Sequence, residues 1–455
     1  MASRLAWSVT SELISILSFR KPSGFNASLG FFASCSLHVA CGNVCAMKMN
    51  QIKLYIKLIA VYGLFSASIL VAQPLPPAPP QAPAPLPATS GSFGQIIAGA
   101  TAAQQSSANL GFLDFQVAET PQTGLGPLFN DSSCLACHGN PSAGGSSRRT
   151  VTRFGQVTAT GFDPLIAEDG SLLHARAIAP SILEKVPANA NVTSLRLTTP
   201  LYGAGLIEAI PDSAIVANAA RPKPPGIGGR VAWITDISTG QLRVGRFGWK
   251  NQHATLLGFS ADALNNEIGV TNRLFPKAAA PDGNETLLAQ FVSLSAPIED
   301  QPSVVTGLSE IDRLTNYMRY LAPPVPAPST PVSVAGRAVF DAIGCAACHT
   351  PTLNTGPNSI TALANQNVNL YSDLLLHDMG SSADGIAQGV ASTKEMRTSP
   401  LWGIRVRQLF MHDGRATTLQ QAILGHAGEG TSSTQAYTRL SATQQSQLIA
   451  FLGTL

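Results

Sequence analysis

Two copies of one short cysteine–histidine motif, CLACH at 134–138 and CAACH at 345–349, carry the clearest chemistry in the sequence. In C-x-x-C-H the two thiols form thioether bonds to a porphyrin, and the adjacent histidine binds the iron from one side. A zinc ribbon needs no histidine after each pair, and a thioredoxin-like site needs one pair only. We therefore expect two covalently bound haems c, attached and ligated by Cys134, Cys137, His138, Cys345, Cys348 and His349.

The group on the opposite face of each iron decides whether a c-type haem transfers electrons or binds a small molecule such as peroxide. In the second half, four residues recur at the spacing of one helix face: Leu419, Ala422, Ile423 and His426. We predict that His426 is the second ligand of the iron bound by His349. The alternatives are a hydrogen-bonded core histidine at 426, or ligation by His377, His412, Met379 or Met411. His412 lies in the turn MHDGRA, where we expect it to contact haem propionates or to fix the loop.

The two motifs belong to a longer internal repeat. Phe129 and Phe340 each lie five residues before a motif, and TTPLYG at 198–203 is echoed by TSPLWG at 398–403. A Thr-Leu pair follows Trp249 and His412 at the same distance. Because the similarities occur in the same order, we expect a duplicated haem domain with pseudo-twofold halves.

The halves differ where a second iron ligand would lie. The residue that matches His426 is Ala263, which cannot bind a metal, and Glu267 follows one helical turn later. We expect an open haem at His138, with Glu267 as the general acid/base that splits an O–O bond; a surface glutamate is the alternative. Trp249 takes the place of His412 between the haems, and is either a core residue or an electron relay.

The predicted fold is mainly α, with two cytochrome c-like haem domains and a β-hairpin insertion in the N-terminal domain. The first half has about 37 more residues than the second between the TxPL motif and Trp249 or His412. They include RVAWITD at 230–236 and QLRVGRF at 241–247, which predict a hairpin that ends near Trp249. Segments 307–321 and 441–455 show helical periodicity and predict one closing helix in each domain.

The N-terminal region is typical of an exported protein. Residues 58–72 are uncharged and apolar and follow three lysines, as in a secretory signal peptide; an uncleaved membrane anchor is the alternative. We expect a start at Met47 or Met49, which makes 1–46 a gene-model extension. The remaining boundaries are a signal peptide at 47–72, Pro-rich linkers at 73–92 and 322–333, and haem domains at 93–321 and 334–455. The expected location is the periplasm, with membrane tethering if the signal is retained.

Composition narrows the class further. The 455 residues are 45% hydrophobic and 12% charged, which argues against a disordered chain. Residues 1–72 hold six of the 29 Lys and Arg and one of the 26 Asp and Glu, so the remainder has a net charge of −2. Such a surface does not attract a polyanion, and nucleic-acid binding is disfavoured.

Several of these segments together resemble the di-haem oxidoreductase family of peroxidases, some of whose members are called thiol oxidoreductases. The segments, within residues 105–455, are GPLFNDSSCLACHGNP, GRFGWKNQHATLLGF with NNEIGVTN, SDLLLHDMGSSADG, and TSPLWGIR followed by FMHDGRATTLQQAILGHAGE. More distantly, the chain is similar to di-haem cytochrome c peroxidases, methylamine dehydrogenase maturation enzymes and rubber oxygenases. The resemblance implies an electron-transfer haem with its distal ligand at His426, a tryptophan between the haems at Trp249 and a distal glutamate near Glu267. Some relatives hold calcium between the domains, but no ligand cluster in this sequence identifies one.

These observations predict a di-haem peroxidase that reduces H₂O₂ at the haem of His138, with electrons delivered through the bis-histidine haem of His349. The expected partners are peroxide or O₂ and an external electron donor, which is a small c-type cytochrome, a cupredoxin or a quinol. Two alternatives remain. One is an oxygenase that cleaves an apolar substrate with O₂. The other is an electron carrier whose first haem has a sixth ligand at His174 or His253.

Overall fold

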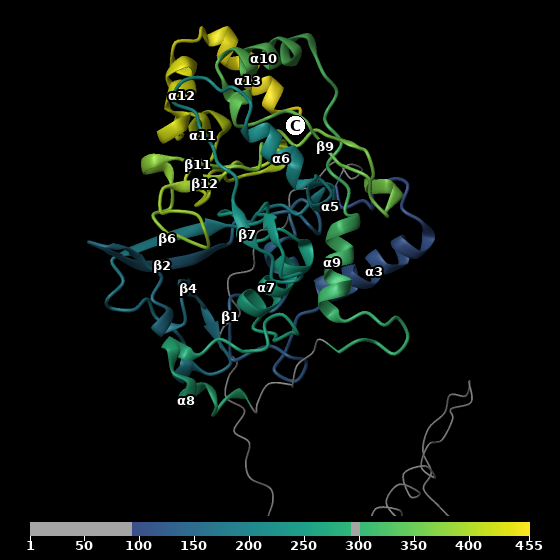
Figure 1. Cartoon of the computed structure of the whole chain (residues 1–455), viewed down its shortest axis with the longest axis vertical. Coiled ribbons are helices and arrows are strands. Elements are labelled where there is room, and N and C mark those ends of the chain that lie inside the picture. Colours follow the sequence, from purple (N-terminus) through teal and green to yellow (C-terminus); the bar gives the residue numbers. More distant parts are fainter. Residues whose placement is uncertain (1–92, 293–300) are drawn as a thin grey trace, which may run out of the picture. The chain divides into compact units, whose positions relative to one another are not determined.

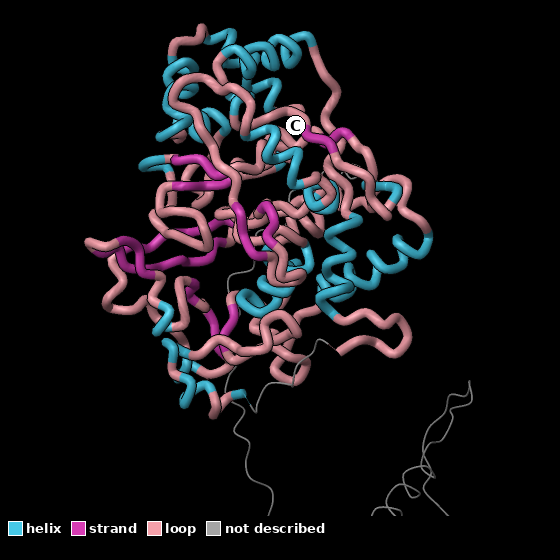
Figure 2. The backbone as a smooth tube through the Cα atoms, in the orientation of Figure 1, coloured by secondary structure: helices cyan, strands magenta, loops and turns pink. Residues whose placement is uncertain are grey.

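The structure is a computed structural model that describes residues 93–292 and 301–455. The predicted extension, signal peptide and first linker, at 1–46, 47–72 and 73–92, lie outside the described residues. Within the described residues, helices and mostly short strands are joined by long loops (Figure 2). Among these described residues, no helix has the length and apolar character that crossing a bilayer requires.

Polar caps mark where several helices begin. Thr101, Thr330 and Ser441 each accept a hydrogen bond at their side chain from the backbone N–H three residues later. Each also donates its own backbone N–H to the side chain of that residue, and these capping boxes start α3, α10 and α13. The helices are α3 (Ala102–Gln116), α4 (Cys134–Cys137), α5 (Ala204–Glu208), α6 (Asp212–Ala219), α7 (Leu256–Ile268), α8 (Glu285–Leu288), α9 (Glu310–Tyr320), α10 (Pro331–Ala342), α11 (Leu419–Leu424), α12 (Thr431–Thr438) and α13 (Ala442–Leu452). The closing helices predicted at 307–321 and 441–455 are therefore α9 and α13.

Two helix pairs, α3 with α9 and α10 with α13, make extensive contacts (Figure 1). A glycine lies at each crossing. A Cβ at Gly111 would lie 1.9 Å from the carbonyl oxygen of Arg313, and one at Gly336 would lie 1.8 Å from that of Gln447. Any larger residue would push the backbones apart, so both pairs depend on glycine for their close approach.

An aromatic contact also recurs in both helix pairs. Phe115 of α3 packs on Tyr317 of α9 with 5.0 Å between ring centroids, and Phe340 of α10 packs on Phe451 of α13 at 5.3 Å. Each contact lies four residues beyond the crossing glycine. In this packing Phe115 has the place that Phe340 has in the second pair, whereas Phe129, which the sequence spacing matched with Phe340, lies in β1.

A four-stranded antiparallel arrangement around β2 was not expected from the sequence. β2 pairs with β3, β4 and β6, and Thr150 lies opposite Leu197 in the β2–β6 ladder. The strands are β1 (Leu128–Phe129), β2 (Thr150–Thr158), β3 (Gly161–Asp163), β4 (Leu172–Leu173), β5 (Arg176–Ala177), β6 (Val192–Leu197), β7 (Trp233–Thr235), β8 (Leu242–Val244), β9 (Leu353–Asn354), β10 (Asn367–Val368), β11 (Leu376–Asp378) and β12 (Glu395–Arg397).

The hairpin expected at 230–247 is present as β7 and β8, with Trp233 opposite Val244. It leads into a tight loop that is closed by an antiparallel bridge between Phe247 and His253 and contains Trp249. Thr255 then caps α7.

The same local arrangement precedes α11. A bridge joins Phe410 to Ala416, the loop contains His412, and Thr418 caps the helix. Trp249 and His412 therefore lie in loops with the same local arrangement, in which a bridge is followed by a helix that a threonine caps.

The largest buried cluster draws on both predicted haem domains. Residues of the first half pack with seven buried residues of the second: Leu353, Leu363, Val368, Leu370, Leu374, Leu375 and Trp402. A smaller cluster is built around α10 and α13. Between the halves, 322–330 has no regular structure, and α10 begins at Pro331 inside the predicted linker, because Thr330 caps the helix and proline suits its first turn.

Candidate functional site

The first C-x-x-C-H motif forms the short helix α4, which Ser133 caps. His138 ends this helix and places its Nδ1 3.1 Å from the carbonyl oxygen of Gly145, while the ring of Phe115 lies 6.1 Å from its own. Burial raises the pKa of the Cys134 and Cys137 thiols to about 12 and lowers the pKa of His138 to about 4. The imidazole is therefore neutral at pH 7, with Nδ1–H directed to a carbonyl and Nε2 left for a metal.

Glu267 lies in the last turn of α7, next to this motif. Its carbonyl oxygen accepts hydrogen bonds from the backbone N–H groups of Asn130 and Asp131. Its Oε2 accepts a 2.8 Å hydrogen bond from the side-chain amide of Asn130. Burial raises the pKa of the Glu267 carboxyl, while Arg153 and Asn130 oppose that rise. Burial is the main cause of the raised pKa of Cys137, and the charge of the Glu267 carboxylate raises it further.

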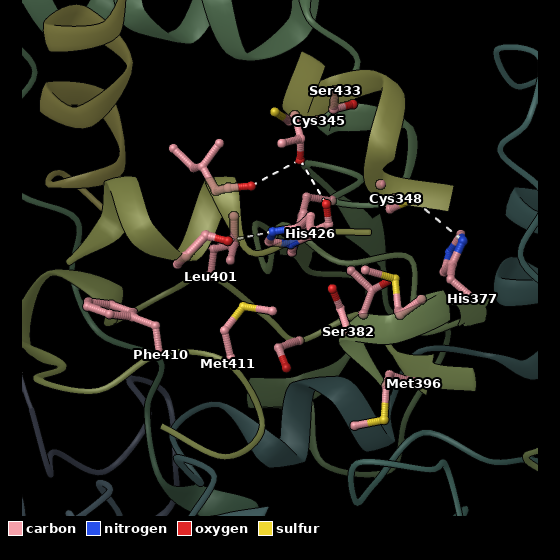
Figure 3. A pocket seen from close by; sticks show the side chains of 18 of the residues that line it. Cys345, Cys348, His377, Ser382, Met396, Leu401, Phe410, Met411, His426 and Ser433 are labelled. Carbon is pink, nitrogen blue, oxygen red and sulfur yellow. Dashed lines mark hydrogen bonds between the residues drawn. The ribbon is translucent and has the colours of Figure 1, made fainter. Parts of the chain in front are cut away.

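The second motif lines a cavity of about 210 Å³ (Figure 3). Cys345 to Ala347 form a single 3₁₀ turn, and the lining is largely apolar apart from a few convergent polar groups. Around the cavity lie His426 and the three residues predicted to share its helix face, together with Trp249, Met379, Met411 and His412. The structure thus brings the second motif and its predicted partners into one site.

His349 and His426 face each other across this cavity. Their ring centroids are 6.5 Å apart, and two metal–nitrogen bonds of about 2 Å plus two imidazole ring radii span roughly the same distance. Nδ1 of His349 lies 2.9 Å from the carbonyl oxygen of Tyr371, and Nδ1 of His426 lies 2.7 Å from that of Ala422. Both Nε2 atoms are therefore left for one metal, so the residues present fit a bis-histidine haem.

Burial favours the ligating form of both rings. It lowers the pKa of His349 to about 4 and also lowers the pKa of His426. A neutral imidazole offers a lone pair to a metal, whereas an imidazolium does not.

The helical position predicted for His426 is wrong in one respect. α11 ends at Leu424 and Gly425 caps it, so His426 lies just beyond the helix. Its Nδ1 is hydrogen-bonded to the carbonyl oxygen of Ala422 in the helix, and its side chain still lines the cavity.

Trp249 and His412 are in contact between the two halves. Their ring centroids are 6.3 Å apart in an edge-to-face arrangement, and Trp249 Nε1 donates a 2.9 Å hydrogen bond to the carbonyl oxygen of Leu197. The backbone N–H of Leu197 in turn donates to the carbonyl oxygen of His412. Burial lowers the pKa of His412 to about 4, and its Nε2 lies 3.3 Å from Arg415.

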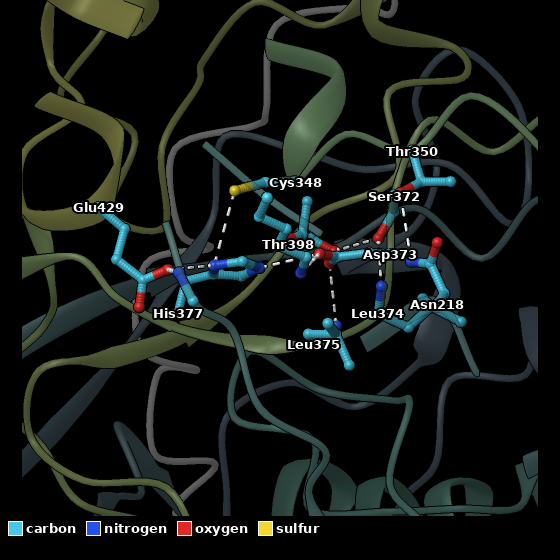
Figure 4. A network of polar contacts seen from close by, with 12 residues as sticks. Asn218, Cys348, Thr350, Ser372, Asp373, Leu374, Leu375, His377, Thr398 and Glu429 are labelled. Carbon is cyan, nitrogen blue, oxygen red and sulfur yellow. Dashed lines mark hydrogen bonds and ion pairs between the residues drawn. The ribbon is translucent and has the colours of Figure 1, made fainter. Parts of the chain in front are cut away.

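His377, an alternative iron ligand, is held on both ring nitrogens by carboxylates (Figure 4). Nδ1 lies 2.7 Å from Glu429 and 3.5 Å from the Cys348 sulfur, and Nε2 lies 2.9 Å from Asp373. Burial would lower the pKa of His377, but these hydrogen bonds outweigh it and raise the pKa to about 12. Such an imidazolium is no metal ligand. Sequence reasoning missed this network because its members, Cys348, Asp373, His377 and Glu429, are separated by up to 81 positions.

The two histidines considered for the first haem also have carboxylate partners. His174 is buried, with Nδ1 2.9 Å from Glu184, and its Nε2 has no hydrogen-bond partner among the described residues. His253 places Nε2 3.2 Å from Asp262. Across 93–292 and 301–455, no group of three or more His, Cys, Asp or Glu side chains is arranged to hold a metal ion.

Comparison with known proteins gives a family match over residues 182–455, which cover the second motif but begin after the first; the matching family is described as "Di-haem oxidoreductase, putative peroxidase". No curated protein matches the chain.

Three solved structures show low similarity to this chain. Kuenenia stuttgartiensis hydrazine synthase is 14% identical, with a TM-score of 0.38 over 84% of this chain and 100% of that one. A MauG-like protein associated with microbial copper homeostasis is 15% identical, with a TM-score of 0.38 over 84% and 94%. The diheme peroxidase BthA from Burkholderia thailandensis is 14% identical, with a TM-score of 0.33 over 77% and 86%.

Proposed function

The chain belongs to the di-haem oxidoreductase family and is an enzyme, and from this premise we propose that it is a peroxidase that reduces H₂O₂ with electrons from an external donor. The observation that carries the proposal is the asymmetry between the two motifs. His349 faces His426 at 6.5 Å, whereas the matching position beside the first motif is Ala263 in α7.

Four cysteines and three histidines would hold the two cofactors. We propose thioether attachment at Cys134 and Cys137 and at Cys345 and Cys348, with His138 as the single protein ligand of the first iron. His349 and His426 together would hold the second. When bound, a haem supplies an iron that exchanges electrons and, where a coordination position is free, binds a small ligand.

Glu267 has the properties of a general acid/base at the first motif. Burial raises the pKa of its carboxyl towards the working pH, and Asn130 holds the carboxylate in one orientation. In this role the carboxylate accepts a proton from one peroxide oxygen and returns it to the other, which leaves as water. Reduction of each H₂O₂ to two water molecules uses two electrons and two protons.

Trp249 and His412 would lie on the route of the electrons. Their ring contact and the bonds through Leu197 link the two halves by short through-space and hydrogen-bonded steps. We propose that electrons enter at the haem of His349 and pass this pair. The donor would be a small c-type cytochrome, a cupredoxin or a quinol, and the location would be the periplasm.

A duplication underlies this arrangement in our proposal. It is supported by the matched helix pairs with their crossing glycines, and by the matched loops that contain Trp249 and His412. The β7–β8 hairpin would then be an insertion in the first copy.

Electron paramagnetic resonance of the ferric holoprotein tests the proposal. We expect one high-spin and one low-spin haem, and H₂O₂-dependent oxidation of a reduced donor that Glu267→Gln abolishes. Glu285→Gln, which changes an exposed glutamate on α8, is the matched control. Two low-spin signals without turnover would identify an electron carrier. A stable O₂ complex with uptake of O₂ but no peroxide reduction would identify an oxygenase.

A further inference from the structure

Two arginines, Arg397 and Arg407, lie in the wall between two cavities. Both line the cavity of the second motif, and both also line a smaller cavity of about 40 Å³. The smaller cavity is lined by residues 199–202 and Phe247 of the first half and by Ser399, Pro400 and Trp402 of the second. The two guanidinium groups therefore lie where the two halves meet.

Neither guanidinium has a carboxylate partner in the described part of the chain. Nε of Arg397 donates a 2.7 Å hydrogen bond to the carbonyl oxygen of Gly248, and its Nη1 lies 3.4 Å from that of Thr398. Nε and Nη2 of Arg407 are buried and have no hydrogen-bond partner there. Burial lowers the pKa of both groups to about 10, with no carboxylate to oppose it.

Two other buried arginines of this protein are paired with carboxylates, whereas Arg153, whose buried Nε also lacks a hydrogen-bond partner in the described residues, lies near the charge of Glu267. Arg196 pairs with Asp384 at 2.6 Å, and Arg246 pairs with Asp212. A buried cation without an anion costs several kcal/mol, so a fold retains one where an anionic group completes the site. A planar guanidinium is matched in shape to a carboxylate, with which it forms two parallel hydrogen bonds.

We propose that Arg397 and Arg407 form a carboxylate-binding site shared by the two cofactors, and that it takes one propionate group from each haem. The inference rests on the proposed function only in requiring two haems. The site would bind carboxylates on both of its sides and so fix the two cofactors with respect to each other.

Arg397 also acts on the relay residue. Its backbone N–H donates to the carbonyl oxygen of Trp249 at 2.9 Å, while its Nε holds the carbonyl of Gly248. Arg397 is therefore a positioning residue for the Trp249 loop as well as part of the carboxylate site. A propionate that binds Arg397 would contact the element that orients the tryptophan.

Redox titration of the purified holoprotein, without peroxide, tests the proposal. In Arg407→Gln, loss of a cation near both propionates stabilises each oxidised iron, so both reduction potentials should fall. We expect at least a tenfold change in each reduction equilibrium, which is about 59 mV for one electron. Arg407→Lys keeps the charge and should shift both potentials less. Arg439→Gln, which removes an exposed cation of the second half, should shift neither.

Unchanged potentials in Arg407→Gln would overturn the site, and a shift of one haem only would overturn its sharing. If the variant fails to bind haem, infrared spectra of the wild-type protein with ¹³C-labelled propionates decide the question. Ionised propionates whose carboxylate bands stay constant between pH 5 and 9 would support the site, and bands that titrate as in water would refute it. Because the titration uses no peroxide, its result does not depend on whether the protein reduces peroxide, which the turnover assay tests.

Discussion

Replacing Asn130 by alanine should move the pH dependence of peroxide reduction to higher pH. The side-chain amide of Asn130 lies 2.8 Å from Oε2 of Glu267 and stabilises its charged form. A hydrogen bond to a charged group contributes about 1.5–3 kcal/mol, and a factor of ten in proton affinity corresponds to about 1.4 kcal/mol. Loss of the amide should therefore raise the pKa of Glu267, and should move the acid limb of the profile upward by about one to two pH units.

The direction of this change follows from the role of the carboxylate. Glu267 must be ionised to accept a proton from peroxide, so activity falls as the pH drops below its pKa. Asn130→Ala should lose activity most at acidic pH and recover much of it at alkaline pH, whereas Glu267→Gln should stay inactive throughout. The backbone bonds from 130 and 131 to Glu267 do not depend on the replaced side chain.

The assay is kcat/KM for H₂O₂ measured from pH 4 to 9 with one reduced donor. Asn266→Ala is the matched control, because Asn266 lies on the same helix and donates to Asp262 rather than to Glu267. A profile of Asn130→Ala that coincides with the wild type, or that moves to lower pH, would refute the role assigned to Glu267.

Four further outcomes are expected. His426→Ala should convert the low-spin ferric signal to high-spin and allow cyanide to bind both haems; an unchanged low-spin signal would point to another ligand such as Met411. Trp249→Phe removes the bond to Leu197 and should slow electron exchange between the haems in stopped-flow experiments, and an unaltered rate would exclude the relay. Gly336→Ala should lower the Tm, because contact of the new Cβ with Gln447 should cost about 1–3 kcal/mol of stability. Gly453→Ala is the control, because the nearest atom lies 3.3 Å from its new Cβ. Equal Tm values for these two variants would contradict the close crossing of α10 and α13. Hydrogen bonds and the charge of Arg230 outweigh burial and hold the pKa of Glu395 at about 2, below its ordinary 4.5. The ionised carboxylate therefore stabilises the fold above pH 4.5, and this contribution is lost as the pH falls towards 2. After allowance for the exposed Arg230 the contribution is about 1–2 kcal/mol, and acid unfolding of Glu395→Gln that follows the wild-type curve would disprove it.

Local signals in the sequence located much of the helical structure and the second site. The cysteine motifs, the Thr-Leu helix starts and the closing helices depend on residues within one or two turns of each other, and the structure has α7, α9, α11 and α13 where they were expected. The proximity of His349 and His426 was predicted because the spacing of Leu419, Ala422 and Ile423 put His426 on an apolar helix face beside an expected haem.

Features that depend on distant residues were not predictable in the same way. Asn130 meets Glu267 across 137 positions, and the partners of His377 come from three separate segments. The β2 sheet escaped notice because burial along β2 does not alternate, so the period of two that marks a strand is absent. Phe129 was matched with Phe340 by spacing alone, whereas packing selects Phe115.

The large apolar cluster that contains Leu353–Leu375 side chains together with those of the first half has an evolutionary and practical consequence. A fragment that ends at residue 321 would expose that surface to water, and one that begins at 334 would carry the missing half of it. We therefore expect that neither fragment folds by itself, and that the two fragments associate when they are expressed together. Under the proposed duplication, fusion of the two copies would have allowed each to lose residues that it needed for independence.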